Sequence, residues 1–191
     1  MSDVLANDLI TPDAGVSPLL SQSDVSILKA APIARLSFRA REAALANAGT
    51  AFGVPLPTQP LSSEIGAKRA ALWMGPDEWT LLAPEEDLET LFETIETALG
   101  DQPHALVDIS ERSEAIIVSG EKAVWLLNTG IFVDFSIEEF PVGTVSRTIF
   151  HKSPVMIWRT GADTFVVEAW VSFMDYVSGL LVQSAQELTA A

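Results

Sequence analysis

Apolar residues recur along this chain with two different spacings. From Leu88 to Leu99 they return every three or four positions while Glu and Thr fill the gaps, which predicts an amphipathic helix. The stretch from Phe173 to Leu181 has the same spacing and predicts a terminal helix. Shorter apolar runs bounded by Gly, Pro and Asp predict strands. These runs span residues 33–39, 69–74, 79–82, 105–109, 115–119, 144–150, 155–159 and 164–169.

Two shorter helices complete the pattern, one from Arg41 to Ala48 and one that follows Gly120. The first half then reads β-α-β-β-α-β and the second β-α-β-β-β-α. A doubly wound parallel sheet requires strict alternation of strand and helix, so this order favours an α+β fold of two related ferredoxin-like halves. We therefore expect a single internally duplicated domain over residues 31–191. The expected duplication rests only on the order of the predicted elements.

Residues 1–30 show no sustained periodicity. They mix Asp, Ser, Pro and Ala, a composition typical of segments that do not join a packed core. We predict a flexible N-terminal arm that the fold does not need.

Composition excludes several classes of function. With 26 acidic and 11 basic residues, the net charge of −15 repels phosphate backbones and disfavours nucleic-acid binding. The chain has no cysteine, which excludes disulfides and thiolate chemistry. No apolar run approaches the roughly 20 residues of a membrane helix, and the first 20 residues contain no base, so we expect a cytoplasmic protein without a membrane contact.

Acidic residues are concentrated in one part of the sequence. No Lys or Arg lies between Arg69 and Arg112, where 11 acidic residues fall. A solvated helix face is the favoured interpretation, and a docking face for a basic partner is the alternative. The candidate docking residues are Glu85, Glu89, Glu93 and Glu96.

The sequence offers little support for chemistry on this chain. It contains neither a G-x-G-x-x-G nor a phosphate-binding G-x-x-x-x-G-K motif. His104 and His151 are far apart and lack metal-ligand spacing. A Ser–His–Asp set can be drawn only from Ser110, His104 and Asp108, without the turn that such a nucleophile needs. We expect no catalytic residue, cofactor site or metal site.

Polar residues at Asp108, Ser110 and Arg112 alternate after an apolar run. In an extended segment they would point the same way. A structural role is favoured, with the Asp and Ser oxygens capping a turn and Arg112 bound to Asp108 or to a carbonyl. An intersubunit contact is the alternative. Most of the five tryptophans are expected in the core, with one or two left for an interface.

Five motifs in series carry a resemblance to a known family. They are L-W-M-G-P-D-E-W at 72–79, V-D-I-S-E-R at 107–112, N-T-G at 128–130, F-P-V-G-T-V-S-R-T at 140–148 and S-F-M-D-Y at 172–176. Together they resemble the gamma subunit of heterotetrameric sarcosine oxidase over about residues 30–185. The order D-x-S, V-S-G, N-T-G is similar to the folate-binding fold of the glycine cleavage T protein, an aminomethyltransferase.

This resemblance implies a non-catalytic accessory subunit with alpha, beta and delta chains as partners. Such complexes demethylate sarcosine to glycine, pass the one-carbon unit to tetrahydrofolate, and use FAD, FMN and NAD held outside the gamma chain. Glu111 and Val171 depart from the His and Arg common in the family. A related complex such as N-methylglutamate dehydrogenase is therefore an alternative.

Candidate site residues follow from these two interpretations. For an interface with partner subunits they are Arg112, Arg147, Phe140 and Pro141, in addition to the acidic residues between Glu85 and Glu96. The alternative of a free-standing folate-binding protein needs a carboxylate for the pterin ring. Only Asp108 and Asp134 are candidates for that carboxylate.

Overall fold

The computed structural model describes residues 9–189, which divide into two compact units. Within that range, unit 1 holds residue 9 and residues 32–110, and unit 2 holds residues 10–31 and 111–189. The chain therefore passes through unit 2 before it builds unit 1, and then returns to unit 2.

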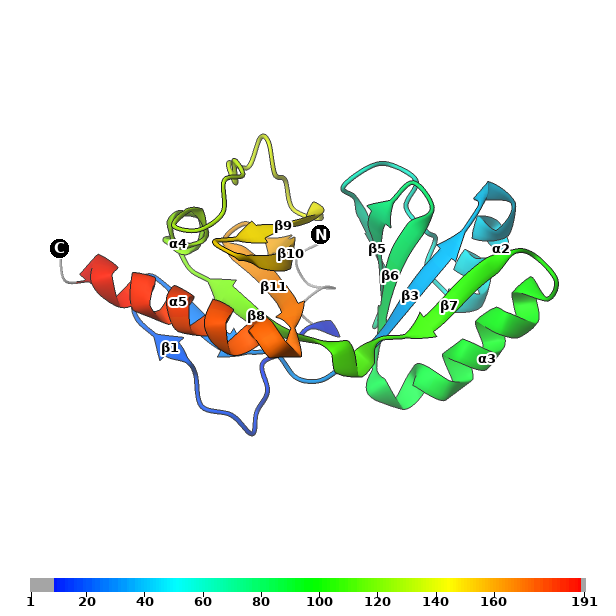
Figure 1. Cartoon of the computed structure of the whole chain (residues 1–191), viewed down its shortest axis with the longest axis horizontal. Coiled ribbons are helices and arrows are strands. Elements are labelled where there is room, and N and C mark those ends of the chain that lie inside the picture. Colours follow the sequence, from blue (N-terminus) through cyan, green and yellow to red (C-terminus); the bar gives the residue numbers. More distant parts are fainter. Residues whose placement is uncertain (1–8, 190–191) are drawn as a thin grey trace. The chain divides into compact units, whose positions relative to one another are not determined.

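Unit 1 is a five-stranded antiparallel sheet with two helices (Figure 1). Its elements are β3 (Ala34–Ala40), α2 (Glu42–Phe52), β4 (Ser63–Ile65), β5 (Ala70–Gly75), β6 (Glu78–Ala83), the 3-10 turn η1 (Glu85–Asp87), α3 (Leu88–Leu99) and β7 (His104–Asp108). The strand order is β4-β5-β6-β3-β7. The four strands β7-β3-β6-β5 have the spatial order of a ferredoxin-like βαββαβ motif, and β4 extends its edge.

Helices α2 and α3 pack against each other on one face of this sheet. The apolar stripe predicted for α3 is buried through Leu91, Ile95 and Leu99, which contact Phe38 and other sheet residues in one cluster. Helix α3 ends at Gly100, as its sequence predicts, because that residue has a positive φ of 52°.

Unit 2 is a six-stranded antiparallel sheet, also with two helices. Its elements are β1 (Leu20–Ser21), β2 (Ser26–Lys29), β8 (Ser113–Ser119), α4 (Ala123–Asn128), β9 (Val145–Phe150), β10 (Ser153–Gly161), β11 (Thr164–Trp170) and α5 (Val171–Thr189). The strand order is β1-β2-β8-β11-β10-β9. A 3-10 turn, η2 (Ser110–Arg112), leads into β8.

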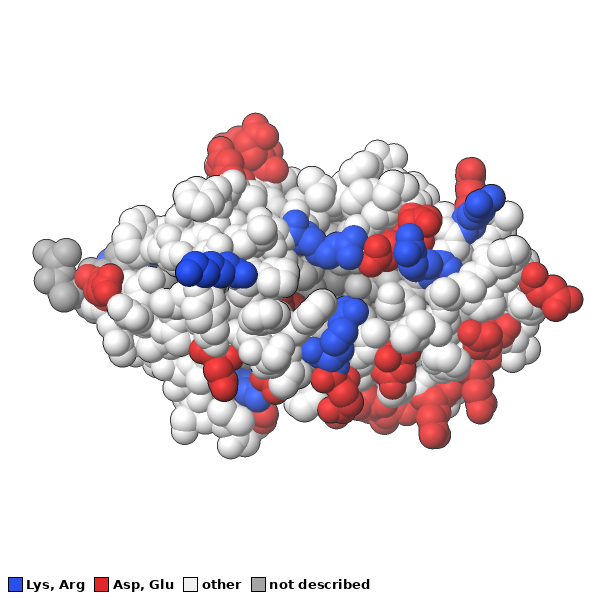
Figure 2. Space-filling view, in the orientation of Figure 1, with Lys and Arg blue, Asp and Glu red and all other residues white. Residues whose placement is uncertain are grey.

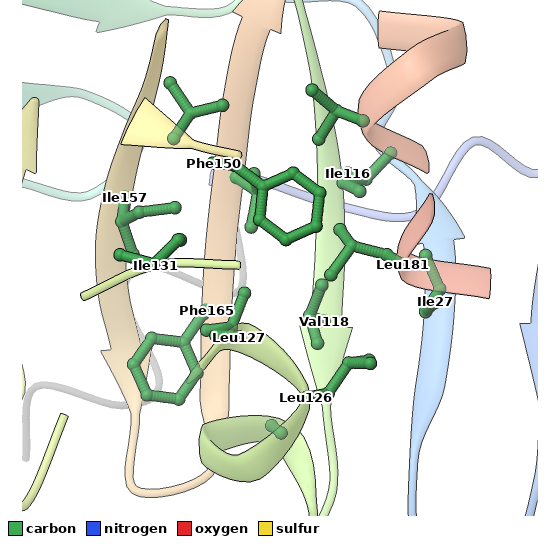
Figure 3. Close-up of a cluster of buried hydrophobic side chains, with 14 of the residues drawn as sticks. Ile27, Ile116, Val118, Leu126, Leu127, Ile131, Phe150, Ile157, Phe165 and Leu181 are labelled. Atoms are coloured by element: carbon green, nitrogen blue, oxygen red, sulfur yellow. The ribbon is translucent and has the colours of Figure 1, made fainter. Parts of the chain in front are cut away.

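The prediction that residues 1–30 form a flexible arm is wrong for the segment that forms β1 and β2. Strand β2 pairs along β8, with Ile27 opposite Val118, and Ile27 is fully buried. Figure 3 shows Ile27 in the same cluster as Ile116, Val118 and Leu181. Burial of one such side chain contributes about 1.5–3 kcal/mol, which explains why a short run without visible periodicity joins the core. Residues 1–8 lie outside the described residues.

The two sheets correspond strand by strand. The order β2-β8-β11-β10-β9 in unit 2 matches β7-β3-β6-β5-β4 in unit 1. Strand β2 thus takes the position that β7 has in unit 1, although β2 precedes β8 in the chain and β7 is the last strand of its unit. The predicted α+β fold of two ferredoxin-like halves is confirmed, and the strand that completes the second half comes from the segment predicted to be an arm.

Candidate interaction surfaces

Asp108 and Ser110 are used to build a turn. The Asp108 carboxylate accepts hydrogen bonds from the backbone N–H of Ser110 (2.9 Å) and from its hydroxyl (2.6 Å). The Ser110 hydroxyl oxygen in turn accepts the backbone N–H of Arg35 at 2.9 Å, which ties the turn to β3. The structural interpretation of these two residues therefore accounts for their contacts.

Arg112 does not continue an extended segment. Ser110–Arg112 form a 3-10 turn, so the prediction that Asp108, Ser110 and Arg112 point the same way is wrong. The polar oxygens of Asp108 and Ser110 bend the chain before the alternation can continue. The Arg112 guanidinium lies over the indole of Trp170, 6.0 Å from its centroid, and both residues are exposed. Arg112 and Trp170 thus form one exposed cation–π pair in unit 2.

Asp134 also takes part in a local turn. Its carboxylate accepts the backbone N–H of Ser136 at 2.8 Å, and this hydrogen bond lowers the pKa of Asp134 below its usual value. The side chain is exposed. Asp134 is therefore an ionised surface carboxylate whose geometry is set by its own loop.

A pocket of 460 Å³ lies beside α2 in unit 1. Leu45, Gly49, Thr50 and Pro55 are part of its lining, which includes neither Asp108 nor Asp134. The single polar side chain of the lining is Thr50, and its hydroxyl donates to the carbonyl of Ala46 at 2.9 Å. A pterin needs a carboxylate that binds its ring nitrogens, so these lining residues do not fit a folate.

The acidic residues of η1 and α3 form an exposed stripe. Glu85, Glu89 and Glu93 follow each other at i,i+4 spacing and are exposed, and Figure 2 shows acidic side chains gathered along this helix. Like charges at this spacing destabilise a helix by a few tenths of a kcal/mol per pair. Glu96 differs, because its carboxylate lies 3.2 Å from Nε2 of His104.

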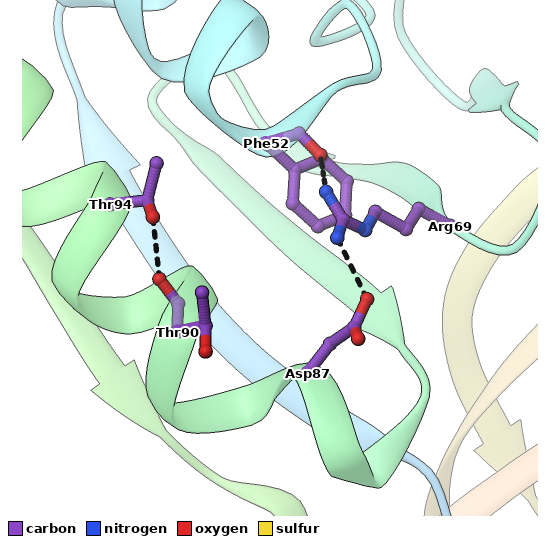
Figure 4. A network of polar contacts seen from close by, with 5 residues as sticks. All are labelled: Phe52, Arg69, Asp87, Thr90 and Thr94. Atoms are coloured by element: carbon purple, nitrogen blue, oxygen red, sulfur yellow. Dashed lines mark hydrogen bonds and ion pairs between the residues drawn. The ribbon is translucent and has the colours of Figure 1, made fainter.

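The start of α3 is fixed to α2 by one arginine. Arg69 donates to the carbonyl of Phe52 (2.8 Å) and to the carboxylate of Asp87 (2.7 Å), as Figure 4 shows. The same guanidinium lies 5.9 Å from the centre of the Phe52 ring. The acidic stripe is therefore presented by a helix whose first turn is held in place.

The segment from Phe140 to Arg147 contains one buried and two exposed candidates. Phe140 is buried, with its ring 5.0 Å from that of Phe135 in an edge-to-face arrangement, so its prediction as an interface residue is wrong. From the sequence alone, an aromatic side chain in a proline-containing loop can face either the core or the solvent. Here packing in the core determines the position of Phe140. Pro141 is exposed, and Arg147 is exposed on the edge strand β9.

The N-T-G motif shapes the end of α4. Asn128 donates through Nδ2 to the carbonyls of Ile131 (3.0 Å) and Val133 (2.7 Å). Gly130 lies so close to the next hairpin that a Cβ atom there would be 2.4 Å from the Phe150 ring. The motif is therefore explained by loop geometry, without a ligand.

Arg159 is the main polar group inside unit 2. Its side chain is buried and donates to four backbone carbonyls. Two of these, Phe135 (3.0 Å) and Phe140 (2.8 Å), belong to the loop between α4 and β9, and the other two, Gly161 and Ala162, to the β10–β11 turn. Burial lowers the pKa of Arg159. A predicted strand residue thus fastens two loops together.

Exposed aromatic side chains were only partly anticipated from the sequence. Trp79 and Trp158 are buried as predicted, whereas Trp125 and Trp170 are about half exposed. Phe132 is 99% exposed and was missed, because an apolar residue between Ile131 and Val133 gives no sign that its side chain faces water. The position of Asn128 was the available signal, since a helix-terminal Asn often binds the carbonyls that follow it.

Residues 9–189 lack two structural features. No group of three or more His, Asp or Glu side chains there is arranged to hold a metal ion. None of the helices in this range is both long and apolar enough to cross a membrane.

Comparisons with known proteins identify a family. The sarcosine oxidase gamma subunit family matches residues 39–187. The sarcosine oxidase subunit gamma of Corynebacterium sp. (strain U-96) is 32% identical over 149 residues, which are 78% of this chain and 71% of that protein. The subunit gamma of Arthrobacter sp. is 31% identical over 142 residues, 73% of this chain and 68% of that protein.

Two solved structures extend the comparison. The heterotetrameric sarcosine oxidase from Corynebacterium sp. U-96, in complex with pyrrole 2-carboxylate, contains a chain that matches with a TM-score of 0.83 and 26% identity. This match covers 100% of this chain and 93% of that chain. The glycine cleavage system aminomethyltransferase T from Bartonella henselae matches with a TM-score of 0.65 at 10% identity, over 84% of this chain and 46% of that chain, and shares the fold alone.

The resemblance carried by the five motifs is thus confirmed by matches over most of the sequence. The chain belongs to the sarcosine oxidase gamma subunit family.

Proposed function

We propose that this chain is the non-catalytic gamma subunit of a heterotetrameric sarcosine oxidase, in which alpha, beta and delta subunits are its partners. The assembled complex oxidatively demethylates sarcosine to glycine and transfers the one-carbon unit to tetrahydrofolate. This chain contributes by packing against larger subunits, which hold FAD, FMN and NAD.

The observation that carries this proposal is the full-length match to a chain of a heterotetrameric sarcosine oxidase. The local geometry supports it. The polar residues with catalytic potential, Asp108, Ser110 and Asp134, are engaged in turns. Exposed aromatic residues such as Trp125, Phe132 and Trp170 suit an interface, where large aromatic side chains are enriched.

Co-expression tests the proposal. The chain is produced with the alpha, beta and delta chains of its own complex, and the same three chains are produced without it. We expect one stable four-subunit complex that oxidises sarcosine and forms peroxide, whereas the isolated chain contains no flavin and has no activity. If three subunits assemble and turn over equally well without this chain, the proposal is wrong.

The same preparation separates the alternatives. Comparison of sarcosine with N-methylglutamate as substrate distinguishes sarcosine oxidase from a related four-subunit complex. Titration of the isolated chain with tetrahydrofolate tests a free-standing folate-binding protein, and we expect no saturable binding, because no carboxylate lines the pocket beside α2.

A further inference from the structure

Phe132 is an aromatic side chain that the fold places almost entirely in water. It is 99% exposed, while Ile131 before it is buried and Val133 after it packs against the core of unit 2. Burying a phenylalanine contributes about 1.5–3 kcal/mol, and here that stabilisation is absent. A single exposed apolar residue is ordinary on a protein surface. The construction of the surrounding loop, residues 131–140, sets Phe132 apart, and we refer to these residues as the Phe132 loop.

Asn128 fixes the backbone on both sides of Phe132. Its side-chain amide donates to the carbonyl of Ile131 at 3.0 Å and to that of Val133 at 2.7 Å. The backbone N–H of Ile131 also binds the carbonyl of Leu127 at 3.0 Å. With Ile131 anchored in the core and both flanking carbonyls held by one amide, the Phe132 side chain is directed outward.

The rest of the loop is also held in place. Arg159 donates to the carbonyls of Phe135 and Phe140, and the rings of these two residues are packed together inside unit 2. Between them Ile137 is exposed as well. The loop therefore presents two apolar side chains on a backbone that needs no ordering when a partner binds, which favours affinity.

Charge indicates the chemistry of that partner. Asp134, Glu138 and Glu139 are exposed in the loop, and no Lys or Arg occurs between Lys122 and Arg147. Figure 2 shows an acidic cluster where Figure 1 draws the loop between α4 and β9. An aromatic anchor surrounded by carboxylates is complementary to an apolar pocket with a basic rim.

We propose that the Phe132 loop is a preformed docking element whose phenyl ring enters an apolar pocket, rimmed by Lys or Arg, on a larger subunit of the complex. This proposal rests on the proposed function. A second copy of this chain is a poor occupant, because it carries a net charge of −15 and would bring the same acidic loop. The acidic rim adds specificity and association rate, and the aromatic anchor supplies most of the affinity.

Competitive co-expression tests the docking element. Tagged wild-type chain and an untagged variant are produced together with the other three subunits, and the ratio of the two forms in purified complex is measured. We expect Phe132→Ala to be incorporated about 30-fold less than wild type, which corresponds to about 2 kcal/mol at an interface hot spot. The incorporation of Phe132→Leu should fall between that of wild type and that of Phe132→Ala. The matched control is Val107→Ala, which truncates a half-exposed apolar side chain on β7 of unit 1 and should be incorporated like wild type.

The acidic rim has its own variant. Glu138→Lys with Glu139→Lys should reduce incorporation at low salt, and the deficit should shrink as salt is raised, because exposed charges are screened. Far-UV circular dichroism and the thermal midpoint of each isolated variant should match wild type, since Phe132, Glu138 and Glu139 are exposed.

The possible outcomes separate this proposal from the proposed function. If tagged wild-type chain itself fails to enter a complex, the proposed function is wrong. If wild type and Phe132→Ala enter the complex equally, the docking element is wrong and the subunit role stands. If Phe132→Ala instead abolishes self-association of the isolated chain and leaves the complex unchanged, the occupant is a second copy and the proposal is overturned.

Discussion

Units 1 and 2 have the same strand order but complete their sheets in different ways. In unit 1 the strand β7 follows α3 directly, so consecutive residues build the whole motif. In unit 2 the same position is taken by β2, which precedes β8 by more than 80 residues. Unit 1 can therefore form from contacts within one continuous segment, whereas unit 2 depends on a pairing between β2, near the start of the chain, and β8, in its middle.

The ion-paired arginines of unit 1 and the buried Arg159 of unit 2 lie in different surroundings, although Arg35 of unit 1 is also buried and Lys29 and Lys122 of unit 2 also pair with carboxylates. In unit 1 the arginines Arg39 and Arg69 pair with the carboxylates of Asp77 and Asp87 at partly exposed positions. In unit 2 Arg159 is buried, and each hydrogen bond described for its side chain is donated to a backbone carbonyl. The exposed aromatic side chains within residues 9–189 all lie in unit 2: Trp125, Phe132, Trp170 and Tyr176. We therefore expect docking to depend mainly on unit 2.

Removal of residues 10–31 should have the largest effect, and it should be confined to unit 2. This deletion takes away β2 with the buried side chains of Val25 and Ile27, which together contribute about 3–6 kcal/mol, and it exposes the edge of β8. Hydrogen exchange should show lost protection in β8 and β11, while β3 and β6 of unit 1 remain protected. Unchanged protection of the β8 amides would show that β2 is dispensable.

Arg159→Met should have the next largest effect. It leaves the buried carbonyls of Phe135 and Phe140 without their donor, so we expect a loss of about 3 kcal/mol or more in the free energy of unfolding. The control in unit 1 is Arg39→Met, which breaks an exposed pair with Asp77 and should cost less than about 1 kcal/mol. Urea unfolding measures both. Equal losses in the two variants would mean that the buried carbonyl contacts of Arg159 stabilise the protein no more than an exposed ion pair does.

Corresponding helices in the two units are followed by glycines that serve different purposes. Gly53 ends α2 with a positive φ of 83°, whereas Gly130 follows α4 where the Phe150 ring leaves no room for a side chain. Gly130→Ala should therefore cost about 2 kcal/mol through overpacking, and Gly53→Ala about 1 kcal/mol through backbone strain. Thermal unfolding of both variants tests this order. A larger loss for Gly53→Ala would mean that the β9–β10 hairpin, which carries Phe150, moves readily to accommodate a Cβ atom at position 130.

Sequence reasoning succeeded where structure is local. Helix α3 and the neighbouring strands β5 and β6 were predicted nearly to the residue from their apolar spacing. Sequence reasoning failed where contacts between residues far apart in the sequence determine the structure. Strand β2 is only four residues long and is stabilised by β8, and a Cβ atom on Gly120 would lie 2.4 Å from the carbonyl oxygen of Asp24. That close approach cannot be read from neighbouring positions.

The candidate site shows the same division. Asp108 and Ser110 were correctly interpreted as turn residues because their contacts lie within two positions of each other. The burial of Phe140 and the exposure of Phe132 depend instead on the carbonyls that Arg159 and Asn128 bind. A hydropathy pattern assigns both phenylalanines the same apolar character, so it cannot separate a core residue from a surface anchor.

The smallest expected effect concerns the contact that leads into β2. Lys122 Nζ lies 2.5 Å from the Asp24 carboxylate, and this hydrogen bond is the main cause that lowers the pKa of Asp24 below the ordinary value of 3.8. Between the lowered and the ordinary pKa the unfolded chain binds more protons than the folded chain, so stability rises with pH there. The contribution of Asp24 is therefore complete above about pH 5 and is lost as the pH falls through the lowered pKa.

Comparison of wild type with Asp24→Asn isolates this contact. The difference in thermal midpoint between them should be largest near neutral pH and should shrink on acidification below pH 3.8. Lys122→Met should remove most of the difference, because it deletes the donor and leaves Asp24 in place. The matched control is Asp77→Asn, which breaks the exposed pair with Arg39 in unit 1. A difference for Asp24→Asn that persists unchanged at pH values well below 3.8 would mean that the carboxylate acts on the β2 segment by packing and not by charge.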